Sequence, residues 1–317
     1  MAETPGRGRI IAAFAAVYII WGSTYLAILY AIETLPPFLM AGTRFLLAGA
    51  LLFGWSALRA DRRPTRAEWR AAAVVGALLL LGGNGAVVWA EQFVASGVVA
   101  LLVAVTPGWM VLLAWLWQQG QRPGRRTVLG LVLGFGGMAL LVGPSALAGA
   151  GSLHLGGVAV VMFGSLAWAT GSIYSRHAPV PPGALYATGM QMLAGGTLLL
   201  IAGFVAGEAS AVQPAAFSAR SILAWLYLVF FGAIVGYSAY VWLLRHVSPG
   251  RVATYAYVNP LVAVALGWAV AGEQITPRMA VAAAIVLAGV AMITLGQYGE
   301  ERAARAAVRA ADTQPAA

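Results

Sequence analysis

Three ionisable side chains lie within or at the edges of long apolar stretches, where a charge is costly unless it finds a partner or water. Arg44 follows Pro37 by seven residues, which places it about 10 Å into a helix that rises about 1.5 Å per residue. Its guanidinium group could pair with Glu33 or Glu91, hold an anionic group of a substrate, or extend toward lipid headgroups. Glu33 and Glu91 could also carry a proton or simply contact water, because a buried carboxyl group can titrate near neutral pH. We therefore treat both glutamates as gating or coupling candidates.

Aromatic and neutral polar side chains recur near the middle of the apolar stretches. Tyr18, Trp21 and Tyr25 share one face of a helix at spacings i, i+3 and i+7. Tryptophan and tyrosine also form belts at membrane interfaces, but Trp21 and Trp168 lie deep within their stretches, so we expect them to line a cavity. Rings mixed with neutral polar groups suit an amphipathic or zwitterionic solute better than a highly charged one. The candidate substrate-binding residues are Trp21, Tyr25, Arg44, Asn84, Trp89, Thr106, Trp168, Ser172, Tyr237, Tyr257 and Asn259.

Pro107 and Pro260 occupy equivalent midpoints of two apolar stretches. Each removes a helical hydrogen-bond donor and frees the carbonyl group four residues earlier, from Val103 and Ala256. A tolerated kink is the plain interpretation. The alternative is a pair of broken helices that line a cavity, whose free carbonyl groups accept hydrogen bonds from a substrate. Pro107 and Pro260 therefore join the gating candidates.

The residues needed for several other chemistries are missing from the sequence. Without cysteine there is no disulfide, thiol nucleophile or thiolate metal site, and without lysine there is no phosphate-binding Walker loop. His154, His177 and His246 lie in separate connections, with no second ligand at metal spacing. The aspartates, Asp61 and Asp312, lie in a basic loop and in the C-terminal tail. We expect no metal, no cofactor, no ATPase motif and no enzymatic activity.

The elements that must position these side chains are membrane-spanning helices. Of the 317 residues, 61% are hydrophobic and 9% are charged, whereas a soluble domain is about 25% charged. At about 20 residues per crossing, the sequence predicts an all-α integral membrane protein with ten spans. They are expected at about 10–31, 37–58, 69–90, 95–117, 127–143, 156–175, 184–206, 221–244, 252–271 and 277–298.

The basic residues indicate how these helices are oriented. All 19 are arginine and the formal net charge is +9, which in a soluble protein would suggest a nucleic-acid surface. Here sixteen arginines lie in connections on one side of the membrane, whereas Arg220 and Arg278 lie on the other. Because cytoplasmic loops carry the excess of positive charge, we expect a multi-pass protein of a bacterial inner membrane with both termini in the cytoplasm. The lipid bilayer is then a partner and nucleic acid is not.

The sequence contains an internal duplication. Residues 83–140 align with 236–293 at a constant offset of 153, with 17 identities over 58 positions. Trp21 matches Trp168 at an offset of 147. Five spans per half is an odd number, so the second half must enter the membrane in the opposite sense. Inverted repeats of this kind are typical of secondary transporters that work by alternating access around a midplane site.

The predicted division of the chain follows from this duplication. It comprises a cytoplasmic tail at 1–9, a first repeat at 10–143, a second repeat at 156–298, and a cytoplasmic tail at 299–317. The second tail is expected to be a short interfacial helix or a disordered end.

Small residues recur every four positions in the fifth and tenth predicted spans, as Gly130 and Gly134 and as Ala280, Ala284 and Ala288. Small side chains let helices approach closely. Tight packing is therefore the plain expectation, and a homodimer contact through the same two spans is the alternative.

Several short motifs resemble those of a known transporter family. The first half contains Tyr18-Ile-Ile-Trp21-Gly-Ser-Thr-Tyr25, Gly42-Thr-Arg44-Phe45, Gly83-Asn84-Gly85 and Ala104-Val-Thr106-Pro107. The second half contains Ser165-Leu-Ala-Trp168, Val247-Ser-Pro249, Tyr255-Ala-Tyr257-Val-Asn259-Pro260 and Gly272-Glu273. Together these motifs resemble the two EamA domains of the drug/metabolite transporter superfamily, and most closely its inner-membrane exporter branch.

The resemblance covers the chain between its tails. It implies ten helices, a central cavity between the repeats, and export of small metabolites, amino acids or amphipathic drugs, so a small-molecule substrate is the expected partner. Glu273 departs from the symmetry, because Gln119-Gly120 stands at the matching place in the first half. Two other functions stay open. A channel would need rings of charge or filter carbonyls, and a membrane-embedded lipid-modifying enzyme would need clustered Asp, His or Cys.

Overall fold

The computed structural model describes residues 6–117, 122–147, 154–247, 249–252 and 254–312. Every regular element within them is helical. This follows from the apolar composition, because only a helix satisfies all backbone hydrogen-bonding groups within one lipid-exposed segment. Among the described helices, nine are long and apolar enough to cross a membrane, and Tyr255–Ala271 is a further, shorter apolar helix. The predicted all-α, ten-helix membrane fold is confirmed.

The spans of the first repeat lie close to their predicted positions. They are α1, η1 and α2 (Arg7–Ala15, Ala16–Ile20, Trp21–Ala31); α3 (Pro37–Ala57); α4, η2 and α5 (Arg66–Val75, Gly76–Asn84, Gly85–Ala90); α6 and α7 (Ser96–Val103, Thr106–Trp117); and α8 (Arg125–Leu147).

The second repeat follows the same order. Its spans are α9 (Leu155–Ser175); α10 (Ala184–Val205); α11, η5 and α12 (Ala219–Tyr227, Leu228–Tyr237, Ser238–His246); α13 and α14 (Pro249–Val252, Tyr255–Ala271); and α15 (Pro277–Asp312). Two 3₁₀ turns, η3 (Glu208–Ala211) and η4 (Pro214–Ala216), lie between α10 and α11. Since α15 continues through Asp312, the predicted C-terminal tail is largely a helical extension of the last span.

The described residues contain three π-helical segments, η1 in the first span and two others at equivalent places in the two repeats. The two equivalent segments are η2 in the third span and η5 in the eighth. With the offset of 153 residues, the last residue of η2, Asn84, corresponds to the last residue of η5, Tyr237. Segments of π-helix occur frequently at functional sites because they change which side chains face a neighbour. Hydrophobic spacing does not distinguish α from π turns, so the sequence did not predict them.

Equivalent spans of the two repeats pack against each other, α3 along α10 and α8 along α15. Glycines bring these backbones together. A Cβ atom on Gly49 would lie 2.9 Å from the backbone nitrogen of Leu193, and one on Gly130 would lie 2.6 Å from the carbonyl oxygen of Gly289. Lipid provides no hydrophobic drive for helix association, so close packing takes its place. The Gly130 side of α8 thus packs within the chain, and a homodimer contact through α8 and α15 stays a prediction.

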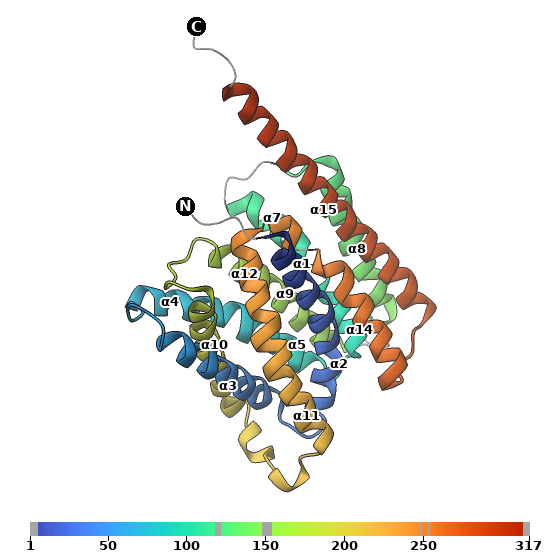
Figure 1. The fold of residues 1–317 in the computed structure, drawn as a ribbon. Helices are drawn as coiled ribbons and strands as arrows, with labels where there is room; N and C mark the ends of the chain where they lie inside the picture. The colour runs from blue at the N-terminus through green and yellow to red at the C-terminus, as the bar shows by residue number, and fades with distance from the viewer. Residues whose placement is uncertain (1–5, 118–121, 148–153, 248, 253, 313–317) are drawn as a thin grey trace.

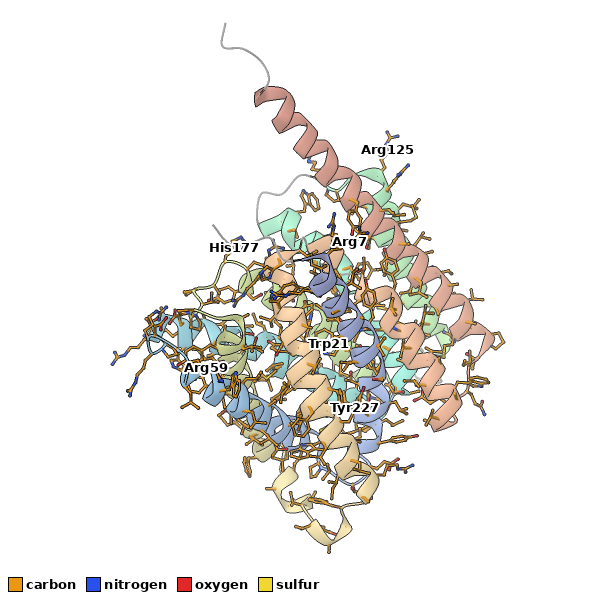
Figure 2. All side chains as sticks on the ribbon, in the orientation of Figure 1. Arg7, Trp21, Arg59, Arg125, His177 and Tyr227 are labelled. Carbon is orange, nitrogen blue, oxygen red and sulfur yellow. The ribbon has the colours of Figure 1, made fainter. Side chains whose placement is uncertain are left out.

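The other spans surround the centre of the bundle in a two-fold pattern. The helix α2 packs against α11 and α14, and its equivalent α9 packs against η2, α5 and α7. The start of α1 and the end of α15 lie at the same end of the bundle (Figure 1). Arg7 and Arg125 lie toward that end and Trp21 lies near the middle (Figure 2). We call it the arginine-rich end, and the opposite end, where α2 ends and α11 begins, the arginine-poor end.

Candidate functional site

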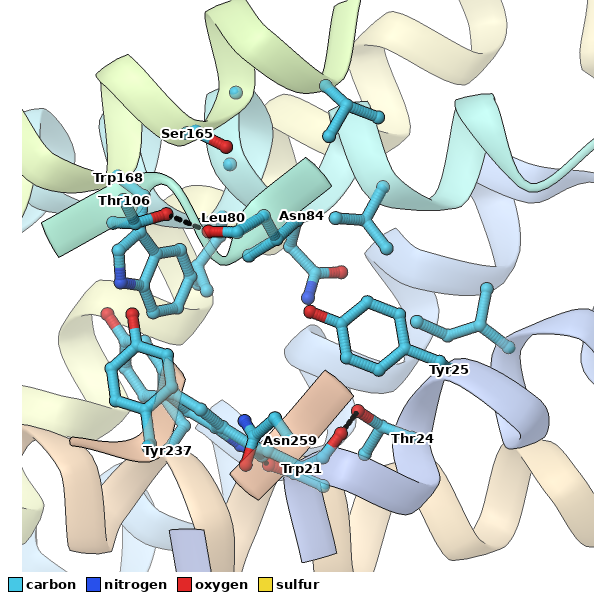
Figure 3. A pocket seen from close by; sticks show the side chains of 18 of the residues that line it. Trp21, Thr24, Tyr25, Leu80, Asn84, Thr106, Ser165, Trp168, Tyr237 and Asn259 are labelled. Carbon is cyan, nitrogen blue, oxygen red and sulfur yellow. Dashed lines mark hydrogen bonds between the residues drawn. The ribbon is translucent and has the colours of Figure 1, made fainter. Parts of the chain in front are cut away.

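A cavity lies between the two repeats, near the middle of the bundle (Figure 3). It holds about 780 Å³ of space free of protein atoms, a volume that includes the solvent at its open mouth. Helices of both repeats contribute to its wall. The predicted substrate-binding residues that line it are Trp21, Tyr25, Arg44, Asn84, Thr106, Trp168, Tyr237 and Asn259.

Aromatic rings from both repeats pack together on one side of the cavity: Trp21, Trp168, Tyr237, Tyr240 and Tyr255, here called the aromatic wall. The ring centroids of Trp21 and Trp168, which are equivalent in the two repeats, lie 5.5 Å apart at an interplanar angle of 81°. Trp168 Nε1 donates to the hydroxyl of Tyr240 at 3.0 Å. Edge-to-face rings with satisfied polar atoms form a stiff, amphipathic surface. The apolar part of a solute can pack on it.

Arg44 is buried at the cavity wall, with 3% of its surface exposed. Its Nη2 donates to Oδ1 of Asn84, and its Nε has no hydrogen-bond partner within the described residues. The equivalent residue in the second repeat, at the offset of 147, is Gln191. Gln191 makes the equivalent contact, because Tyr237, the counterpart of Asn84, donates to its Oε1 at 3.0 Å. The second repeat thus makes this helix contact without a charged residue. The contact therefore does not require the positive charge of Arg44, and this charge can interact with a solute in the cavity.

The partners predicted for Arg44 lie elsewhere. Glu33 forms a salt bridge with Arg220, with Oε2 and Nη2 2.6 Å apart, so the expected pairing of Arg44 with Glu33 is wrong. Glu91 is 4% exposed, and within the described residues neither of its carboxylate oxygens has a hydrogen-bond partner. Arg44 and Glu91 form no salt bridge within the described residues, so the expected pairing of Arg44 with Glu91 is wrong as well. Extension of Arg44 toward headgroups is also wrong, because its side chain is buried against the cavity.

The two prolines behave differently. The fourth span is broken directly before Pro107, since α6 ends at Val103 and α7 begins at Thr106. The hydroxyl of Thr106 donates to the Val103 carbonyl at 2.6 Å, so this carbonyl already has the partner that Pro107 denies it. Pro260 lies inside the continuous helix α14. The prediction of two matching broken helices with free carbonyl groups is therefore wrong for Pro260, whose helix is not broken. At Pro107 the helix is broken as predicted, but the carbonyl group is not free.

Three predicted substrate-binding residues lie outside the cavity wall. Trp89 packs against other rings at the arginine-poor end. Ser172 lies behind the aromatic wall, with its Oγ 2.7 Å from the hydroxyl oxygen of Tyr240. Tyr257 points toward α15 and donates to the carbonyl of Val290. Tyr257 is two residues from both Tyr255 and Asn259, and two residues turn a helix by about 200°, so it faces away from the cavity that these neighbours line.

Other residues of the wall were missing from the prediction. Among the polar ones are Thr24 and Ser165. Helical spacing could have found Thr24, three residues beyond Trp21, and Ser165, three residues before Trp168. The hydroxyl of Ser165 is buried and has no hydrogen-bond partner within the described residues. It is therefore a free polar group at the cavity.

Comparisons with known proteins match the chain to membrane transporters. The sequence model of the EamA-like transporter family matches residues 8–143 and 155–295. The inner membrane transporter YedA of Escherichia coli is 38% identical over 290 residues, which is 91% of this chain and 92% of YedA. The transporter YvbV of Bacillus subtilis is 24% identical over 290 residues, 92% of this chain and 93% of YvbV.

Two further matches concern activity and fold. A probable amino-acid metabolite efflux pump of Salmonella typhimurium is 23% identical over 285 residues, 88% of this chain and 93% of the pump. A solved crystal structure superposes with a TM-score of 0.64 at 20% identity, covering 92% of this chain and 98% of the other. At that identity the likeness concerns the fold alone.

Proposed function

The chain belongs to the EamA-like transporter family, and from this membership we propose that it exports small amphipathic solutes across a bacterial inner membrane by alternating access. Its family and its apolar spans make it a membrane transporter. The observation that carries the proposal is the cavity, to which the two repeats contribute equivalent residues such as Trp21 and Trp168. Inverted repeats around a midplane cavity can rock between two conformations of similar energy.

Carboxylate groups join the two repeats at the arginine-poor end. Within the described residues these contacts are Glu33 with Arg220, Glu208 with the backbone N–H groups of Phe38 and Leu39, and Glu273 with Ser96 and Gly97. Each contact connects one repeat to the other, so together they hold the arginine-poor end closed. This supports a conformation that is closed at that end, as one state of an alternating-access cycle requires.

The chemistry of the cavity favours a solute with an apolar body and a carboxylate. The aromatic wall offers rings for the apolar part, and the guanidinium of Arg44 offers donors whose geometry matches a carboxylate. The same positive charge disfavours cations that lack an anionic group. Amphipathic amino acids and related metabolites satisfy both conditions, in agreement with the name of the Salmonella relative, a probable amino-acid metabolite efflux pump.

Both termini are proposed to face the cytoplasm, with the arginine-poor end on the outside. The chain has no cysteine, so a single cysteine reports its own position. A membrane-impermeant thiol reagent added to intact cells is expected to modify the Thr34→Cys variant and to leave the Arg63→Cys variant unmodified. Modification of both from the outside would contradict the inverted arrangement.

The export proposal is tested with purified protein in two steps. A thermal-shift screen against amino acids, sugars and amphipathic drugs identifies ligands, because a ligand that binds only the folded state raises the melting temperature. The radiolabelled ligand is then followed in proteoliposomes, where a carrier shows saturable uptake that is accelerated by unlabelled ligand on the opposite side. A linear flux without such acceleration would instead support a channel, and chemical conversion of the ligand would support an enzyme.

A further inference from the structure

Glu91 is a buried carboxyl group that does not line the cavity. It directly follows α5, one helical turn beyond the cavity residue Val87 and on the same face. It is 4% exposed, and within the described residues neither of its oxygens accepts a hydrogen bond. A buried carboxylate without donors is unfavourable in its charged form. Its position, between the cavity and the arginine-poor end, is where a gate would lie.

Ionisable groups on the surrounding elements act electrostatically on Glu91. Those whose electrostatic interaction reaches Glu91 are Tyr25 on α2, Arg44 on α3 and Glu273 in the connection between α14 and α15. Burial and the negative charge of Glu273 raise the pKa of the Glu91 carboxyl, whereas the positive charge of Arg44 lowers it. On α9 the titratable group at this end is His154, whose ring stacks on Phe93 and whose Nδ1 accepts from the backbone of Gly157 at 3.0 Å.

Glu273 forms one of the contacts that hold the arginine-poor end together. Its Oε1 accepts from the backbone nitrogen of Ser96 at 2.8 Å and from its hydroxyl at 2.7 Å, and its Oε2 accepts from the nitrogen of Gly97 at 3.1 Å. The carboxylate of one repeat thus caps the first turn of α6 in the other. A second negative charge on Glu91 would repel Glu273 in a medium of low dielectric constant. A proton on Glu91 removes that repulsion.

The second repeat shows that the fold does not need a carboxyl group at this place. With the offset of 153, the counterpart of Glu91 is Leu244, which is buried at the end of α12. An apolar residue therefore fills the equivalent position. The carboxyl group of Glu91, like the charge of Arg44, is a feature of the first repeat without a structural requirement behind it.

From these observations we propose that Glu91 is a proton-binding site that controls the arginine-poor end: protonated Glu91 leaves the Glu273–Ser96 contact closed, and ionised Glu91 opens it. The inference rests on the proposed function, in that an exporter driven by protons needs a group that binds a proton from outside and closes that side. In this order of events, Glu91 loses its proton to the cytoplasmic side while the arginine-poor end is closed. Its ionisation then opens that end, and a proton bound from the outside closes it again.

The proton itself is detected first, without any transported solute. Infrared difference spectra of the purified protein in lipid, recorded between pH 5 and pH 9, are expected to contain the carbonyl band of a protonated carboxyl group that disappears as the pH rises. The band should be missing from the Glu91→Gln variant and retained in the His154→Asn variant, whose side chain can still cap α9. An unchanged band in Glu91→Gln would overturn the proposal.

The gate is measured next, with a single cysteine at the cavity. Ser165→Cys is nearly isosteric and replaces a hydroxyl without a partner within the described residues. In right-side-out membrane vesicles, a membrane-impermeant thiol reagent should modify this cysteine faster as the pH rises. At each pH, the modification rate of the Ser165→Cys protein is divided by that of the double variant Ser165→Cys, Glu91→Gln. Both proteins carry the same thiol, so this ratio no longer contains the pH dependence of the thiol itself. If one proton closes the gate, this ratio rises by at most about tenfold per pH unit.

The outcomes separate the two proposals. A ratio that does not change with pH, or a pH dependence that His154→Asn abolishes, overturns the assignment to Glu91. Glu91→Asp should restore the pH dependence that Glu91→Gln removes, which a merely structural role would not do. Neither measurement involves a transported solute. A protein that shows the proton band and the gate but no saturable flux would contradict the proposed export while leaving the proton site in place.

Discussion

Replacing Arg44 by glutamine makes the first repeat copy the second, because Gln191 occupies the equivalent position. The amide that this substitution introduces is able to keep the contact to Asn84, as Gln191 keeps the contact to Tyr237 at 3.0 Å. The substitution also removes a buried charge whose Nε has no partner within the described residues. We therefore expect Arg44→Gln to fold normally, with a melting temperature within about 3 °C of the wild type.

Ligand binding should respond quite differently. A hydrogen bond to a charged group contributes about 1.5–3 kcal/mol, which corresponds to roughly a tenfold to 150-fold change in Kd. The wild type should thus bind an amphipathic amino acid, such as phenylalanine, more tightly than phenylalaninamide, which lacks the carboxylate. Arg44→Gln should lose most of this difference. Titration calorimetry of the purified protein with both compounds measures it.

A matched control distinguishes the charge from the helix contact. Gln191→Leu removes the equivalent contact to Tyr237 in the second repeat but leaves Arg44 in place. It should lower the melting temperature and preserve the preference for the carboxylate. The reasoning fails if Arg44→Gln keeps the full preference, or if it lowers the melting temperature by more than Gln191→Leu does.

Three further outcomes follow from packing and exposure. Trp21→Ala removes half of the tryptophan pair at the centre of the aromatic wall and should destabilise the protein by about 3–5 kcal/mol; Trp21→Phe should retain folding but weaken binding of aromatic ligands, as measured by calorimetry. Gly130→Ala should impair folding, because its Cβ would lie 2.6 Å from the Gly289 carbonyl oxygen, whereas Gly134→Ala, whose Cβ would meet no atom within 4 Å, should be tolerated; yields of monodisperse protein in size-exclusion chromatography compare the two. Glu33→Gln should change the stability by less than about 1 kcal/mol, because its salt bridge with Arg220 is solvent-exposed; a large loss in a thermal-shift assay would show that this contact is a structural lock.

The positions of the spans could be predicted because the bilayer imposes a length on each apolar segment. The same argument, combined with the duplication, placed Trp21 and Trp168 at one depth in opposite halves, and their rings meet at 5.5 Å. Depth and symmetry are both properties of the sequence alone. The two tryptophans, selected by these two criteria together, line the cavity, whereas Pro107 and Pro260, selected in the same way, do not.

Side-chain direction and partners could not be predicted in this way. Tyr257 was placed by depth, but its rotation about α14 turns it toward Val290. The partner of Arg44 depends on which side chain the end of η2 presents to α3, and it presents Asn84 from a π-helical turn. The expected free carbonyl group near Pro107 is also absent, because the hydroxyl of Thr106 donates a hydrogen bond to the carbonyl of Val103. These features depend on contacts between helices that the sequence does not specify locally.

The differences between the repeats carry as much meaning as their likeness. Two frames of equal shape can exchange conformations with little change in energy, which alternating access requires. A fully symmetric cavity, however, would hold two arginines whose charges repel each other in a medium of low dielectric constant, and it would bind a solute in two opposite orientations equally well. Arg44 is equivalent to Gln191, and Glu91 is equivalent to Leu244. The helices of the two repeats are therefore arranged symmetrically, whereas their charges are not. A solute with one charged end then has one preferred orientation in the cavity, and one end of the cavity can sense protons.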